Sequence, residues 1–216
     1  MQITIIGAGN MARGIATRAL AGGHTVTLTA KDPAKAARLA EELSAQAAGD
    51  ATVRVGDDST VDTAELVVLA VPFTAAKALA ASLGARLSGK VLVDISNPVD
   101  ASLDALVVTP GTSAAEEVAG AAAPGTKVVK AFNTTFATTL VAGQVGGTPL
   151  DVFIAGDDEA ARKQVAELVT SGGLHPVDVG ALKHARALEG FQLLHMALQI
   201  SEGGHGWAST VKLITP

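Results

Sequence analysis

The sequence predicts an α/β protein with a doubly wound parallel sheet, and three observations point to that fold class. Short runs of apolar, largely β-branched residues alternate with Ala-rich helical stretches over the first two thirds of the 216-residue chain. These runs are continuously apolar, which is typical of strands that helices cover on both faces. The first run leads directly into a Gly-rich turn that opens a helix. Such an alternation builds a parallel sheet with right-handed crossovers.

The expected elements follow the chain in order. The apolar runs predict strands at 3–6, 26–29, 66–71, 91–95, 127–132, 152–155 and 175–179. Helices are expected at 11–20, at 33–47, from Pro72 to about residue 87, and at 158–169. Together these elements make residues 1–180 the α/β domain.

The last stretch of the chain has a different pattern. Residues 182–201 predict one long helix, which Gly203 and Gly204 stop, and between 191 and 200 it is apolar almost all round. A helix of this kind must be buried on more than one side. We expect residues 181–216 to form a C-terminal helix and tail with substrate-site contacts, and the helix to pack against a partner subunit in a homodimer. Burial against its own domain is the alternative.

Composition excludes several classes of function. The chain carries a net charge of −5, so it lacks the basic surface that nucleic acid would require. It has no cysteine, which excludes disulfides, thiol catalysis and Cys-based metal sites. The N-terminus resembles a strand rather than a signal peptide, and no apolar run approaches the ~18 residues of a membrane span. We expect a soluble, cytoplasmic protein that acts on a small molecule.

The Gly-rich turn has the pattern of a dinucleotide-binding loop in its proper strand–turn–helix context. Gly7 permits the tight turn, Gly9 lets the backbone approach a pyrophosphate, and Ala12 fills the third position, where a small residue is needed. The phosphates would lie on free N–H groups at the start of the helix. This is the Rossmann fold's fingerprint; a glycine turn without a ligand is the alternative.

The end of the second strand indicates which dinucleotide binds. An NAD-binding protein would place Asp or Glu there for the ribose hydroxyl, whereas this chain has Ala30 and Lys31. Lys31, with Lys35 one turn later and Arg38 beyond it, supplies positive charge for a 2′-phosphate. Asp32 directly precedes a proline and is interpreted as a helix N-cap. NADP(H) is therefore preferred, with an ordinary solvated helix start as the alternative.

The loops across the sheet are neutral. Ligands lie at the carboxyl ends of parallel strands, where the sequence places Val71-Pro72, Asn97-Pro98 and Asn133-Thr134. Amides and hydroxyls suit a nicotinamide carboxamide, and none of these residues donates a proton at neutral pH.

Acid–base candidates elsewhere are few. Lys130 and Asp94 fall within strands, while Glu189 and His195 lie on the apolar helix, where core or interface positions are the simpler interpretation. The five histidines are scattered without metal-ligand spacing. We assign no catalytic side chain and no metal site.

Four segments together resemble one family. They are residues 7–14, Val71-Pro72, residues 94–98 and residues 130–134. The chain is similar over nearly its whole length to NADP oxidoreductases that depend on the deazaflavin coenzyme F420, and to the cytoplasmic domains of six-transmembrane metalloreductases. The resemblance implies direct hydride transfer between NADPH and coenzyme F420 or a similar flavin-like acceptor. Direct transfer needs two positioned rings and excluded water rather than an acid.

The resemblance also implies which residues bind the cofactor. The pyrophosphate loop matches Gly7, Gly9, Asn10, Met11, Ala12 and Arg13. Ala30 and Lys31 stand where the family usually has Ser-Arg, and Lys35 matches a basic residue. Lysine is only a point charge, so NADP selectivity is expected to be looser than in the family. Residues 133–136 differ from the loop of the F420-reducing members, which leaves the second substrate open.

Two other functions remain open at this point. One is an NADPH-dependent reductase of a small imine or carbonyl compound, in which Lys130, His195 or an ordered water is the acid. The other is a redox sensor that binds NADP and performs no chemistry.

Overall fold

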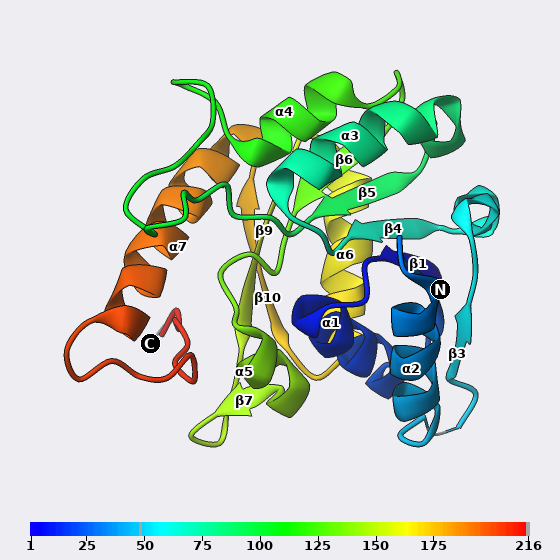
Figure 1. Cartoon of the computed structure of the whole chain (residues 1–216), viewed down its shortest axis with the longest axis horizontal. Coiled ribbons are helices and arrows are strands. Elements are labelled where there is room, and N and C mark those ends of the chain that lie inside the picture. Colours follow the sequence, from blue (N-terminus) through cyan, green and yellow to red (C-terminus); the bar gives the residue numbers. More distant parts are fainter. Residues whose placement is uncertain (48, 215–216) are drawn as a thin grey trace.

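The computed structural model describes residues 1–47 and 49–214, and in it an eight-stranded sheet lies between two layers of helices (Figure 1). The strand order is β10-β9-β6-β5-β4-β1-β2-β3. The strands are β1 (Gln2–Ile6), β2 (Thr25–Thr29), β3 (Thr52–Val55), β4 (Leu66–Leu69), β5 (Val91–Asp94), β6 (Lys127–Lys130), β9 (Asp151–Gly156) and β10 (His175–Gly180). Two further short strands, β7 (Gln144–Val145) and β8 (Thr148–Pro149), form a separate hairpin.

Helices cover both faces of the sheet, and each face has its own buried cluster. One face carries α1 (Asn10–Ala21), α2 (Pro33–Ser44) and α6 (Glu159–Ser171), with the short α5 (Ala137–Ala142) against α1. The other carries α3 (Phe73–Leu83) and α4 (Ala114–Ala121). Helix α7 (Ala185–Ile200) follows β10 and contacts α4. The doubly wound α/β fold with a helical C-terminal region is thereby confirmed.

Local chemistry explains the boundaries of the elements. β4 is a continuous Leu-Val-Val-Leu run and is buried throughout, as a central strand between two helical layers must be. Asp32 caps α2, because its side chain accepts the N–H of Ala34 at 3.0 Å and a proline follows at the first helical position. The capping role predicted for Asp32 is therefore confirmed.

The sheet departs from the expected all-parallel arrangement at one side. β9 and β10 are parallel to each other, but β9 is antiparallel to β6, pairing Val129 with Gly156 and Lys130 with Ala155. The connection after β6 contains α5, whose six residues span about 9 Å at 1.5 Å per residue. Helix α5 packs against α1, and after the β7–β8 hairpin the chain re-enters the sheet as β9, antiparallel to β6.

Several elements were not predicted from the sequence. β3 is an edge strand whose side chains are mostly exposed, so it lacks an apolar run. The eight-residue α4 and six-residue α5 were also missed. The helix expected over 182–201 starts as a 3-10 turn at Leu182–His184 before α7. Residues 215–216 of the expected C-terminal segment lie outside the described residues.

Candidate functional site

The Gly-rich loop joins β1 to α1 and leaves the start of the helix open. Gly7 has a φ of +131°, and a Cβ there would lie 2.2 Å from the carbonyl oxygen of Ala70, so only glycine fits. Gly9 is the N-cap of α1, has no capping side chain, and would have no atom within 4 Å of an added Cβ. Ala12 is fully buried on the inner side of the helix. The first N–H groups of α1 therefore face open space, where an anion can bind.

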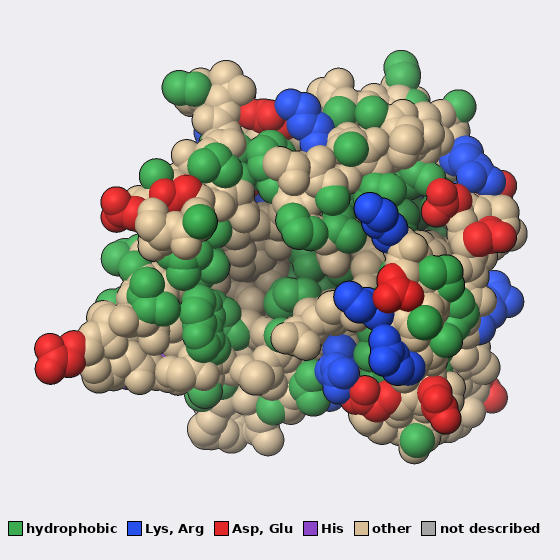
Figure 2. All heavy atoms as spheres, in the orientation of Figure 1, with side chains coloured by type: hydrophobic (Ala, Val, Ile, Leu, Met, Phe, Trp, Pro, Cys, Tyr) green, Lys and Arg blue, Asp and Glu red, His purple; other side chains and the backbone are tan. Residues whose placement is uncertain are grey.

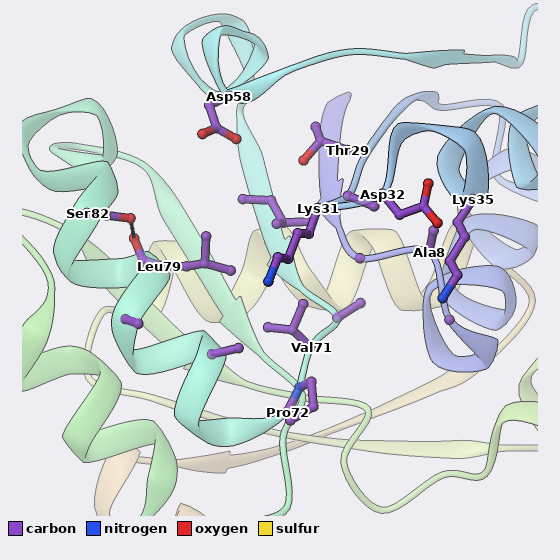
Figure 3. Close-up of a pocket in the computed structure, with 17 residues that line it drawn as sticks. Ala8, Thr29, Lys31, Asp32, Lys35, Asp58, Val71, Pro72, Leu79 and Ser82 are labelled. Carbon is purple, nitrogen blue, oxygen red and sulfur yellow. Dashed lines mark hydrogen bonds between the residues drawn. The ribbon is translucent and has the colours of Figure 1, made fainter.

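A large cavity of about 1110 Å³ extends from this loop along the end of β2 (Figure 3). The residues that line it include Gly7, Gly9, Ala30, Lys31 and Lys35. Figure 3 shows the Lys31 side chain extending into the space between the strand ends and α3, while Lys35 extends beside Ala8. In the described part of the chain neither lysine forms an ion pair. Two unpaired ammonium groups at the end of the second strand provide the charge that a ribose phosphate requires.

A cleft continues from this cavity across the carboxyl ends of the strands. A second space of about 340 Å³ shares Gly9, Val71 and Pro72 with the first, and reaches Asn97. A third, of about 460 Å³, shares Asn10, Met11 and Asn97 with the second. Figure 2 shows the surface hollowed at its centre, with Lys and Arg side chains on one side of the hollow and mostly uncharged surface over α7 on the other. The cleft is therefore charged at one end and neutral at the other.

Two asparagines form the floor of the neutral end. Asn97 Nδ2 donates to the backbone oxygen of Asn133 at 2.8 Å, and Asn133 Nδ2 donates to Asn97 Oδ1 at 3.0 Å. Asn133 Oδ1 is buried and has no partner among the described residues, as is also true of Thr134 Oγ1. Phe132, which precedes them, has a φ of +62° although it is not glycine. A strained, buried turn with an unpaired acceptor is an arrangement that suits binding a hydrogen-bond donor of a ligand.

The remaining space at the neutral end is lined by residues of α5, α7 and the tail. None of the side chains that line the 460 Å³ cavity is charged among the described residues. They are Asn10, Met11, Ile95, Asn97, Asn133, Thr135, Phe136, Ala137, Thr138, Gln192, Met196 and Trp207, together with Gly206. Gln192, Met196 and Trp207 were not predicted individually, although substrate-site contacts were expected of residues 181–216, and Phe136 belongs to the loop 133–136 that the resemblance places near the second substrate. The chain after α7 reaches the cleft through tertiary contacts, and no local sequence pattern predicts such contacts.

A buried ionic cluster lies behind this floor. Lys130 Nζ is 2.7 Å from Asp94 Oδ2, 2.7 Å from Glu189 Oε1 and 2.6 Å from the backbone oxygen of Ser96, and all three charged side chains are fully buried. Glu189 also accepts the N–H of Ala114 at the start of α4. Burial raises the pKa of Glu189 above its usual range although Lys130 opposes the shift. The cluster joins β5, β6, α4 and α7, and it does not line the cleft.

Most of the residues predicted for the cofactor line this continuous cleft. Ala12 and Thr134 are buried beside it, and Pro98 follows Asn97 in the same loop. Arg13 points away, because its guanidinium pairs with Glu42 on α2. Within residues 1–47 and 49–214, no cluster of three or more metal-ligating side chains occurs. None of the helices in this part of the chain is both long enough and apolar enough to span a membrane.

Comparisons with known proteins show which proteins this chain is similar to. The family model described as "NADP oxidoreductase coenzyme F420-dependent" matches residues 2–98. The F420-dependent NADP reductase of Methanothermobacter marburgensis is 29% identical over 209 residues, which cover 93% of each chain. A crystal structure of an Arthrobacter sp. FB24 protein assigned as an F420-dependent NADP-reductase matches with a TM-score of 0.83 and 29% identity, covering 99% of each chain.

A further relative is the metalloreductase STEAP3 of Rattus norvegicus, which is 33% identical over 192 residues. That match covers 89% of this chain, which spans only 36% of the metalloreductase's length. The two full-length matches, the family model and the loop at Gly7 and Gly9 agree with one another. The chain is similar over nearly its whole length to coenzyme F420-dependent NADP oxidoreductases, and residues 2–98 match the model of that family.

Proposed function

We propose that this protein transfers a hydride between NADPH and a deazaflavin, coenzyme F420, or a similar flavin-like acceptor. The observation that carries the proposal is the continuous cleft, with a phosphate-binding loop and free lysines at one end and a neutral, aromatic-lined cavity at the other. The dinucleotide lies across the strand ends with its adenosine half near Lys31. The nicotinamide reaches Asn97 and Asn133, and the acceptor ring occupies the neutral cavity.

Hydride transfer from carbon to carbon needs no acid at the reacting atoms, which fits this lining. A reductase of an imine or carbonyl would need a proton donor. Lys130 is enclosed by two carboxylates, and His195 donates to or accepts from Ser209 at 2.8 Å outside the neutral cavity. Neither group is placed to protonate a substrate there, so this alternative has less support.

The test is anaerobic mixing of the purified protein with NADPH and oxidised deazaflavin. We expect rapid loss of the deazaflavin's visible absorbance together with oxidation of one NADPH for each deazaflavin reduced. Tight NADPH binding without reduction of deazaflavins or flavins would refute the proposal and favour the NADP-binding sensor. A solvent-deuterium effect on reduction of an imine or carbonyl would instead support the acid-dependent enzyme.

Cofactor selectivity depends on Lys31 in this proposal. Lys31→Glu places a carboxylate where the 2′-phosphate would lie, so the preference for NADPH over NADH should fall by roughly tenfold or more, equivalent to about 1.4 kcal/mol. Lys163→Glu makes the same charge change on α6, where Lys163 pairs with Glu159, and serves as the control. An unchanged NADPH/NADH ratio of kcat/KM in Lys31→Glu would refute the role given to Lys31.

A homodimer through α7 forms part of the same proposal. The inner face of α7 buries polar side chains such as Glu189 and Gln192, whereas Phe191, Leu194 and Leu198 are 41%, 60% and 49% exposed. An apolar stripe of this kind on the outer face suits a second copy of the chain. Light scattering should give a dimer for the natural protein and a monomer for Leu194→Lys; the control Val107→Lys, also at an exposed apolar position, should stay dimeric.

A further inference from the structure

The chain beyond α7 folds back and closes one side of the neutral cavity. The cartoon shows the tail (red) curling under α7 toward α5 (Figure 1). Trp207 lies in this segment between Gly206 and residues that return to the body of the protein, and it lines the cavity together with Phe136 and Met196. Trp207 as a whole residue is 36% exposed.

The backbone at Trp207 is held in an unfavourable conformation. Its φ is +62°, which L-residues other than Asn and Asp seldom adopt, and such a conformation persists only where surrounding contacts impose it. Thr138 Oγ1 donates to the carbonyl oxygen of Trp207 at 2.8 Å, and the N–H of Trp207 donates to Gln199 Oε1 at 3.2 Å. Gln199 is itself buried and donates to Ser209 Oγ at 2.9 Å. The strain and these bonds fix the indole at the cavity.

Trp207 and Phe136 line the cavity side by side and contact each other edge to face. Trp207 and Phe136 pack edge to face, with centroids 5.2 Å apart and an interplanar angle of 84°. In this T-shaped arrangement the edge of one ring contacts the face of the other, so the two ring planes are nearly perpendicular rather than stacked. Met196 and Met11 add polarisable thioethers, which adapt to flat aromatic partners.

We propose that Trp207 determines the specificity for the second substrate, by forming the wall against which a planar, uncharged ring packs. The inference rests on the proposed function for the identity of the acceptor. The cavity of about 460 Å³ holds a ring system, and its uncharged lining requires that any phosphate or carboxylate on the acceptor stay outside. The substrate class is therefore a neutral heteroaromatic ring whose anionic groups, if present, extend on a chain away from Trp207.

Trp207 is the one tryptophan in the sequence, so its fluorescence reports on this wall alone. The protein, saturated with NADP+, is titrated with 5-deazariboflavin, and free N-acetyltryptophanamide at equal concentration corrects for light absorbed by the ligand. We expect saturable quenching of the tryptophan emission. If emission does not change in a saturable way while NADPH still reduces the deazaflavin, Trp207 does not contact the ring and the proposal is overturned, although the proposed function stands.

Variants at Trp207 distinguish the contribution of the indole ring from that of the backbone conformation. Trp207→Gly removes the indole and favours the positive φ, so it should fold and should raise KM for 5-deazariboflavin by roughly tenfold, with KM for NADPH unchanged. Trp207→Phe should restore KM to within about threefold. Ile214→Ala, an exposed tail residue outside the cavity, is the control. An unchanged KM for the deazaflavin in Trp207→Gly would overturn the proposal. Saturable quenching without any turnover would instead refute the proposed hydride transfer, while the contact between Trp207 and the ring would still hold.

Discussion

At the scale of single residues, Gly7 and Gly9 belong to one motif, but glycine is needed at the two positions for different reasons. The fold requires glycine at position 7, because a Cβ there would collide with the carbonyl of Ala70. Gly9 leaves open space above the start of α1. The fold requires the first glycine, and under the proposed function the second leaves room for a pyrophosphate.

This difference makes a prediction with a built-in control. Gly7→Ala should lower the free energy of unfolding by about 3 kcal/mol through the clash and the unfavourable φ. Gly9→Ala should cost no more than about 1 kcal/mol, since alanine is only a poorer N-cap, but should weaken NADP+ binding at least roughly tenfold. Urea denaturation and calorimetric titration measure the two quantities. Equal losses of stability in both variants would contradict this division of roles.

The buried cluster around Lys130 leads to a second prediction at this scale. Lys130→Met leaves Asp94 and Glu189 buried without a cation, so the free energy of unfolding should fall by about 3–5 kcal/mol. Adding Glu189→Gln removes one of the two stranded carboxylates and should recover part of the loss. A double-mutant cycle by urea denaturation checks this; strictly additive single effects would show that the two groups do not interact.

At the scale of elements, what could be predicted depended on whether the signal was local. The buried strands β1, β2, β4 and β5 and the loop between β1 and α1 each have their pattern within a few residues, and they were predicted correctly. β3 is a mostly exposed edge strand without an apolar run, and no local pattern indicates that β9 runs antiparallel to β6. For the same reason the Gly-rich loop and the lysines after β2 have a local signal in the sequence, whereas no local pattern indicates that Trp207 lines the neutral cavity.

Helix α7 contributes a pH dependence through His195. Burial lowers the pKa of His195, and the nearby His205 adds to the shift. The folded state therefore holds this ring neutral, packed 4.5 Å from Phe136, and its contribution to stability is present above about pH 6.5 and is lost as the pH falls. Below that pH the natural protein should lose more free energy of unfolding than His195→Gln. Parallel curves for the two proteins, measured by urea denaturation from pH 7 to 5, would argue against this role.

At the scale of the whole molecule, the site needs both parts of the chain. The cavity at Lys31 is lined entirely by residues 6–82, whereas the neutral cavity takes residues from Asn10 to Trp207. Leu182 and Ala185 belong to the buried cluster beneath α3 and α4, and Glu189 completes the pairing of Lys130. This shared packing argues that a boundary at residue 180 does not separate two folding units.

The last prediction follows from this shared core. The full chain at fixed concentration should unfold in one transition whose calorimetric and van't Hoff enthalpies agree. A chain ending at Gly180 should expose the cluster that Leu182 and Ala185 cover, bind a hydrophobic dye and give a poorly dispersed amide NMR spectrum. A chain ending at Val211 is the control: among the described residues it loses the hydrogen bonds of Lys212 to Pro149 and Asp151 and of Leu213 to Asp151, and it should stay folded. A well-dispersed spectrum and cooperative melting for residues 1–180 would instead establish an independent dinucleotide-binding domain, with the C-terminal segment added to it for the second substrate.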